Sequence, residues 1–256
     1  MTDTSHKSFP VVGIGASAGG LEAVSEMIAE LPATTGMAFL LVQHLDPVHE
    51  SFLTEILAKR AALTVETAAD GATLTPDHLY VIPPNTIMAV EDGTLRLRSR
   101  DSEERPHKPV NILFRSLAEQ LGHRAIAVVL SGTDSDGADG MGEIKAAGGI
   151  TMAQEPASAK FDGMPKSAIA TGFVDFVRAP KDLGKEILQI ARHPYLNSGS
   201  PDGLTQEEIA CGEFSACCRA GTERIFRDTS APQFNAGSRG VWLYVRLTAS
   251  RSTPTC

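Results

Sequence analysis

Short apolar runs alternate with segments of helical periodicity along most of the chain. Residues 9–15 and 37–43 are apolar runs, and between them residues 21–32 repeat apolar positions at helical spacing as far as Pro32. This pattern predicts a strand, a tight turn and a helix, followed by a second buried strand. The same criteria predict further strands over 79–84, 124–132 and 150–154, an edge hairpin around 94–100, and helices over 49–61, 110–122 and 140–149.

Strands that are apolar throughout and alternate with helices are typical of a parallel sheet that is covered on both faces. We therefore expect an α/β fold with a doubly wound, mostly parallel sheet and helices on both faces, in three layers. Ligands of such sheets bind beyond the carboxyl ends of the strands. The polar residues at those ends are the candidates for function.

Charge and cysteine content divide the chain of 256 residues into two parts. Residues 1–196 hold 17 basic and 25 acidic residues, so they carry all of the net charge of -8. Residues 197–256 hold six Arg, no Lys, six acidic residues and all four cysteines. We expect a leader over 1–8, a main domain over 9–195, and a tail over 196–256 that is either disordered or the truncated, out-of-frame remnant of a following domain.

Several classes of function are disfavoured by these features. The acidic balance counts against nucleic acid as the partner, and the cysteines lack the second Cys or His pair that a zinc site needs, so they give a metal site little support. The N-terminus lacks a secretory signal, and the apolar runs are far shorter than the roughly 18 residues of a membrane span. We expect a cytoplasmic protein without membrane insertion.

The first predicted strand ends in GIGASAGG, over residues 13–20, which fits two chemical patterns. Residues 15–19 form GxSxG, where a sharp strand-to-helix turn would project the Ser17 hydroxyl as a nucleophile. Residues 13–18 form GxGxxA, which would place a pyrophosphate on the helix N-terminus. A third interpretation is that the glycines only allow close packing of a helix on the strand.

The ends of the next two predicted strands favour the nucleophile. A dinucleotide site needs an acid at the end of the second strand, which instead ends in Gln43 and His44. His44 is suited to remove the Ser17 proton, although a lone histidine there is also common as a structural residue. The third strand runs into a segment with three acids, any of which could orient the histidine or simply cap a turn: Asp134, Asp136 and Asp139.

Several ordered strings between residues 9 and 195 resemble the catalytic domain of bacterial chemotaxis protein-glutamate methylesterases of the CheB type. They are VVGIGASAGGLEAV, LVQHLDPVHESFLTEIL, YVIPPN, VNILFRSLAEQLG, VVLSGTDSDGADGM and FDGMPKSAIATGFVD. The resemblance implies a doubly wound α/β domain that hydrolyses γ-glutamyl methyl esters on methyl-accepting chemoreceptor helices and releases methanol. Many members also deamidate selected glutamines, and no cofactor is expected.

The family's functional residues map onto this sequence one by one. Its nucleophile corresponds to Ser17, its base to His44 and its orienting acid to Asp136. Two further groups would complete the site: the backbone N–H groups of Ala18 and Thr133 as oxyanion donors, and Gly163, Met164 and Pro165 as part of the wall near the substrate.

The sequence also departs from the family pattern. Asp134 stands where many relatives have glycine, and it either acts on its neighbours or points into solvent. No receiver domain is expected before the first strand. The motifs are most similar to the opening part of methylesterase–methyltransferase fusions, in which the methyltransferase follows where the tail begins here. A methyltransferase acting in trans is a further expected partner. Two rival functions remain, a dinucleotide-binding oxidoreductase and a catalytically impaired docking module.

Overall fold

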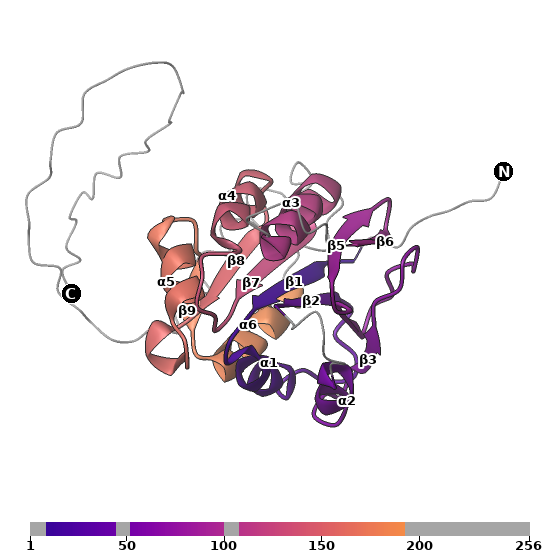
Figure 1. Ribbon diagram of the computed structural model, residues 1–256, viewed down its shortest axis with the longest axis horizontal. Coiled ribbons are helices and arrows are strands. Elements are labelled where there is room, and N and C mark those ends of the chain that lie inside the picture. Colours follow the sequence, from indigo (N-terminus) through magenta and orange to yellow (C-terminus); the bar gives the residue numbers. More distant parts are fainter. Residues whose placement is uncertain (1–8, 45–51, 100–107, 193–256) are drawn as a thin grey trace, which may run out of the picture. The chain divides into compact units, whose positions relative to one another are not determined.

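A parallel sheet of seven strands forms the centre of the domain, which the computed structural model describes over residues 9–44, 52–99 and 108–192 (Figure 1). The leader expected over 1–8 and the tail expected over 196–256 lie outside the described residues. The strands are β1 (Val11–Ala16), β2 (Ala38–Gln43), β3 (Thr64–Thr67), β4 (His78–Val81), β7 (Ala125–Val129), β8 (Ile150–Gln154) and β9 (Phe176–Arg178). Every pairing between neighbours in this sheet is parallel.

The order of the strands places a topological switch point between β1 and β7. The sheet runs β3-β4-β2-β1-β7-β8-β9, so the chain first places β2, β3 and β4 on one side of β1 and then β7, β8 and β9 on the other. The connections therefore leave β1 and β7 toward opposite edges of the sheet. In open α/β sheets such a topological switch point is where ligands bind, at the carboxyl ends of the strands.

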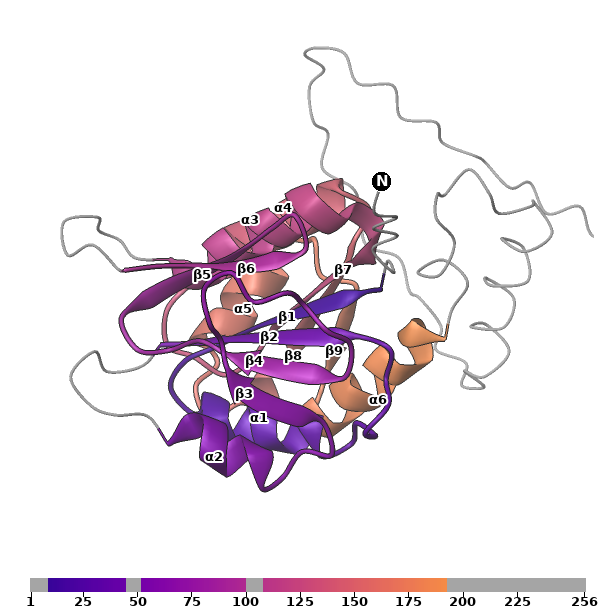
Figure 2. The same ribbon diagram turned by 90° about the vertical axis from the view of Figure 1, so that its right-hand side faces the viewer.

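Helices cover both faces of the sheet, which gives the expected three layers (Figure 2). One face packs against α1 (Gly20–Ile28), α2 (Leu53–Ala58) and α6 (Pro180–Ala191). The other face packs against α3 (Pro109–Leu121), α4 (Ala138–Ala146) and α5 (Gly163–Ala170). An antiparallel hairpin of β5 (Thr86–Glu91) and β6 (Thr94–Ser99) packs beside α3. The predicted doubly wound α/β fold is therefore confirmed.

From Val12 to Ala16, strand β1 carries side chains on one face and bare backbone on the other. Val12 and Ile14 point into the cluster of α1, α2 and α6. Gly13 and Gly15 lie under α3, where an added Cβ would stand 2.5 Å from Cδ1 of Leu117 and 2.3 Å from Cγ1 of Val110, respectively. Because both distances are far below van der Waals contact, only glycine lets α3 lie directly on β1. Close packing thus accounts for both glycines.

Several elements differ from the pattern-based expectation. The helix predicted over 49–61 is described only as Leu53–Ala58. The edge strands β3 and β9 were not predicted, because three of the four β3 residues are exposed and β9 has only three residues. Helices α5 and α6 were also not predicted from periodicity. None of the helices in the described ranges combines the length and apolar character that crossing a bilayer requires.

The packing of α3 on β1 can be tested with Gly15→Ala. The new methyl group would overlap both Val110 methyls, so we expect a loss of about 1–3 kcal/mol in the free energy of unfolding, measured by urea denaturation. Val110→Ala removes the atoms that the methyl meets. The double variant should therefore lose less unfolding free energy than the two single variants lose together. Strict additivity of the two losses would contradict this account.

Candidate active site

Ser17 lies at the carboxyl end of β1, at the switch point of the sheet. Its N–H donates to the carbonyl of Ser131 after β7, and its own carbonyl accepts from the N–H of Gly20, both at 2.9 Å. Gly19 between them has a φ of 71°, and a Cβ there would stand 2.7 Å from the Ser131 hydroxyl oxygen. Glycine is therefore required for the sharp turn from β1 into α1, which leaves Ser17 at the strand end.

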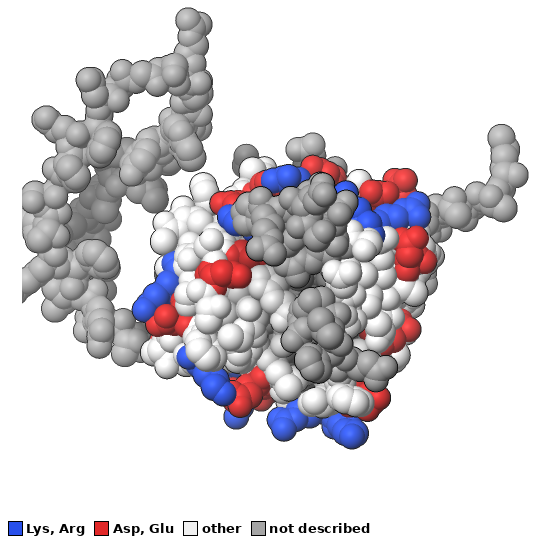
Figure 3. All heavy atoms as spheres, in the orientation of Figure 1, with Lys and Arg blue, Asp and Glu red and all other residues white. Residues whose placement is uncertain are grey.

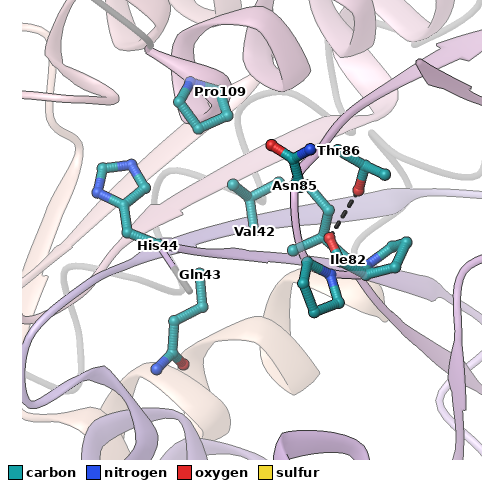
Figure 4. A pocket seen from close by; sticks show the side chains of 9 residues that line it. Val42, Gln43, His44, Ile82, Asn85, Thr86 and Pro109 are labelled. Atoms are coloured by element: carbon teal, nitrogen blue, oxygen red, sulfur yellow. Dashed lines mark hydrogen bonds between the residues drawn. The ribbon is translucent and has the colours of Figure 1, made fainter. Parts of the chain in front are cut away.

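His44 follows β2 in register with Ser17. Ala16 pairs with Gln43 across the two strands, and the N–H of His44 donates to the Ala16 carbonyl at 3.2 Å. The side chains of His44 and Gln43 point to opposite sides of the chain (Figure 4). The parallel pairing of β1 with β2 therefore brings His44 beside Ser17 at the same edge of the sheet.

Asp136, in the loop after β7, is held rigidly and is only 2% exposed. Its Oδ2 accepts from the N–H of Val110 (2.9 Å) and contacts Nε2 of His44 (3.0 Å). Its Oδ1 accepts from the N–H groups of Asn111 (3.0 Å) and Gly137 (2.9 Å). Val110 and Asn111 belong to the first turn of α3, whose N–H groups have no partner within the helix. The helix end thus fixes a carboxylate that in turn fixes the imidazole.

The other two acids of this loop have different partners. Oδ2 of Asp134 lies 3.3 Å from Nδ1 of His44, and its Oδ1 accepts from the N–H of Asp136 at 2.9 Å. Asp139 instead accepts from Lys108 (3.0 Å) and from the side-chain amide of Asn111 (3.1 Å). Asp134 therefore contacts two of its neighbours although its side chain is 49% exposed. His44 lies between two carboxylates.

Two backbone donors are available beside Ser17. A Cβ added to Gly132 would stand 2.9 Å from the Cβ of Ser17, so the serine packs against the start of the loop that follows β7. Among the described residues, the N–H groups of Ala18 and Thr133 donate to no acceptor, and the Ser17 hydroxyl has no hydrogen bond. These groups are therefore free to bind a ligand.

The segment that begins α5 packs against the same loop. The N–H of Met164 donates to the Gly132 carbonyl at 2.9 Å, and its buried side chain would collide with any side chain at position 132. A Cβ on Gly163 would stand 2.6 Å from the Thr133 carbonyl oxygen. Gly163 and Met164 therefore lie beside the residues around Ser17, and Pro165 follows them as a buried residue of α5.

A shallow hollow of about 260 Å³, which includes open solvent, adjoins His44 (Figure 4). Its far side is the segment from Ile82 to Thr86, where the Thr86 hydroxyl donates to the Pro83 carbonyl at 2.6 Å. Asn85 in this segment has a φ of 54°, which is unusual for a residue with a side chain.

Basic and acidic side chains are interspersed over the described part of the face in Figure 3.

Neither a dinucleotide nor a metal ion finds a suitable set of groups here. Gly13 and Gly15 are covered by α3, so they cannot cradle a pyrophosphate, and β2 ends in Gln43 and His44 rather than in an acid. Within the described ranges, no group of three His, Cys, Asp or Glu side chains is placed to hold a metal ion.

Two contributions to this site were not predicted from the sequence. Ser131 is 1% exposed, and its hydroxyl donates to the Ala18 carbonyl (2.8 Å) while accepting from the N–H of Phe161 (3.0 Å). It therefore ties the turn after β1 to the segment before α5. The N–H donors of α3 were also missed. A serine directly after a strand, and Pro109 at the first position of a helix, were the available signals.

Comparison with known proteins identifies close relatives. A family model described as CheB methylesterase matches residues 12–187. The chain is 39% identical over 171 residues to a protein-glutamate methylesterase/protein-glutamine glutaminase of Pectobacterium atrosepticum, covering 65% of this chain and 49% of that protein. It is 41% identical over 172 residues to an uncharacterized 104.1 kDa protein of Rhodobacter capsulatus, covering 63% of this chain and 18% of that protein.

A solved structure is also similar. The CheB methylesterase catalytic domain of Thermotoga maritima superposes with a TM-score of 0.67 and 28% sequence identity, covering 72% of this chain and 99% of that one. The chain spans about half the length of the curated methylesterases that it matches.

Asp136→Asn tests how far the buried carboxylate organises this region. The amide keeps one oxygen for the N–H groups of Val110, Asn111 and Gly137, so at least one buried donor loses its acceptor. We expect a loss of about 1–3 kcal/mol in the free energy of unfolding, measured by chemical denaturation.

The matched control is Asp139→Asn. It removes the same charge from an ion pair with Lys108, in which the Asp139 side chain is 66% exposed, so we expect a change of less than about 0.5 kcal/mol. Equal losses in the two variants would contradict a special structural role for Asp136.

Proposed function

The chain belongs to the CheB methylesterase family, and from this premise we propose that it hydrolyses the γ-methyl esters of glutamate side chains in a protein substrate. The observation that carries the proposal is the arrangement of three strand ends. Ser17 and His44 follow paired strands in register, and a buried carboxylate, Asp136, holds Nε2 of His44 at 3.0 Å. A serine, a histidine and an aspartate also serve acyl transfer on unrelated folds, where the aspartate holds Nδ1 of the ring instead of Nε2.

The proposed reaction proceeds through an acyl-enzyme. The Ser17 oxygen attacks the ester carbonyl carbon while Nδ1 of His44, the ring nitrogen not bound to Asp136, takes the hydroxyl proton. The N–H groups of Ala18 and Thr133 stabilise the oxyanion. Collapse of the intermediate breaks the bond to the methoxy group, which leaves as methanol with the proton from His44. Water, activated by the same imidazole, then releases the glutamate and restores Ser17.

We propose methyl-accepting chemoreceptor helices as the substrate, with a methyltransferase in trans supplying the methyl groups and with both reactions in the cytoplasm. The resemblance in the motifs around Ser17, His44 and Asp136 supports this substrate. The relatives named protein-glutamine glutaminase support a second reaction at the same site, in which ammonia leaves from a glutamine side chain instead of methanol. Gly163 and Met164 are proposed to form part of the substrate-side wall.

Ser17→Ala tests the nucleophile directly. With a methylated chemoreceptor fragment as substrate, we expect methanol release by this variant to fall at least about 10³-fold, because the attacking oxygen is lost. Methanol is measured by a coupled oxidase assay. Ser99→Ala, at an exposed position on β6, is the matched control and should release methanol at the rate of the unaltered chain.

Three outcomes distinguish the rival functions. Equal methanol release by the Ser17→Ala variant and the unaltered chain would overturn the nucleophile assignment. No release from any form of the protein, together with retained binding of the receptor fragment, would support the impaired docking module. Binding of NAD(P)H would support the oxidoreductase, for which the packing of Gly13 and Gly15 against α3 leaves little room.

A further inference from the structure

His44 lies between two carboxylates rather than beside one. Asp136 holds Nε2 at 3.0 Å, and Oδ2 of Asp134 lies 3.3 Å from Nδ1. The Asp134 side chain is 49% exposed, but its other oxygen accepts the N–H of Asp136 at 2.9 Å, which orients the group toward the ring. The contact at Nδ1 therefore comes from a half-exposed side chain whose other oxygen is anchored to the backbone.

The two contacts have a simple consequence for the protons on the ring. A carboxylate only accepts hydrogen bonds, so Nε2 must carry a proton to bond to Asp136. The contact between Nδ1 and Asp134 is likewise favourable only when Nδ1 carries a proton, because a ring lone pair and a carboxylate repel each other. Both contacts are favourable together only in the imidazolium form, which has no free lone pair. In that form His44 cannot take the proton of Ser17.

We propose that Asp134 is a positioning residue that competes with Ser17 for Nδ1 of His44. The consequence for catalysis rests on the proposed function. Turning the half-exposed carboxylate away from the ring, or removing the proton from Nδ1, makes the base available. The residue at position 134 thereby sets the pH range in which the enzyme works.

In the described part of the chain, no recorded cation contact offsets this pair of carboxylates. Lys108, at the start of α3, pairs with Asp139 at 3.0 Å. The segment from Ile82 to Thr86, on the far side of the hollow next to His44, contains no ionisable side chain. The charged groups before and within the first turn of α5 pair elsewhere: Asp162 with Lys166, and Lys160 with Glu22.

The sign of the effect follows from the charge. A second carboxylate stabilises the imidazolium, so it moves the acidic limb of the rate profile to higher pH. Asp134→Asn keeps an oxygen to accept the N–H of Asp136 but removes the charge. Its acidic limb should lie about half to one pH unit lower, which gives about three- to tenfold higher kcat/KM on the steep part of the limb and little change on the plateau.

Two further variants separate charge from structure. Asp134→Gly, which removes the whole side chain, should shift the limb in the same direction as the asparagine variant. Asp139→Asn removes an equal charge nearby, in the first turn of α4, but from a carboxylate that is paired with Lys108. Its limb should coincide with that of the unaltered chain. If the role of Asp134 were purely structural, its variants would have a lower plateau of kcat/KM and an acidic limb at the same pH as the unaltered chain.

The closing experiment measures His44 itself. The imidazole nitrogens are titrated by NMR in the unaltered chain and in the three variants, alongside the methanol assay. We expect the His44 midpoint to fall in both Asp134 variants and to stay fixed in Asp139→Asn. Identical midpoints and limbs in all four proteins, with methanol released, would overturn the role of Asp134 and leave the proposed function intact. Shifted midpoints without methanol release from any protein would support the Asp134–His44 pairing and overturn the function.

Discussion

The close approach of helix α3 to strand β1 is the constraint on which the rest of the site depends. It is possible only because Gly13 and Gly15 present no side chain to Leu117 and Val110. Once α3 lies on the strand, its first turn stands at the carboxyl edge of the sheet, and two of its N–H groups bind Asp136. A packing requirement within the core thus determines where a buried carboxylate can be held.

The order of the strands supplies the remaining groups. Because β2 and β7 flank β1 and run parallel to it, the residues that follow these three strands meet at one edge of the sheet. Hydrogen bonds between the loops then fix their relative positions: Ser17 to Ser131 in the backbone, and Ser131 to Ala18 and Phe161 through its hydroxyl. Sheet topology therefore brings the proposed nucleophile, base and acid to one edge, and hydrogen bonds from the first turn of α3 then fix the carboxylate of Asp136.

Much of this was predictable from the sequence, and the remainder has physical reasons. Apolar strands that alternate with helices indicated a covered parallel sheet, and the rule that ligands bind at strand ends pointed to Ser17 and His44. The short strand β9 and the exposed strand β3 were missed because an edge strand buries too little to show a pattern.

The orientation of Asp134 was not predictable in the same way. An acid in a loop can cap a turn, point into solvent or pair with a neighbour at similar cost. Here it does two of these at once, since one oxygen caps the N–H of Asp136 and the other faces His44. Only the placement of β2 beside β1 and of the loop after β7 brings the imidazole within reach. Tertiary contacts therefore decide a question that the local sequence leaves open.

The central claim is that His44 activates Ser17 as a nucleophile, and covalent labelling tests it most directly without assuming a substrate. The chain is treated with an activated organophosphonate, digested, and analysed by mass spectrometry. The account predicts a single adduct on the peptide that contains Ser17, and labelling at least about 10²-fold slower in His44→Gln. No adduct on Ser17, or equally fast labelling without the imidazole, would contradict it.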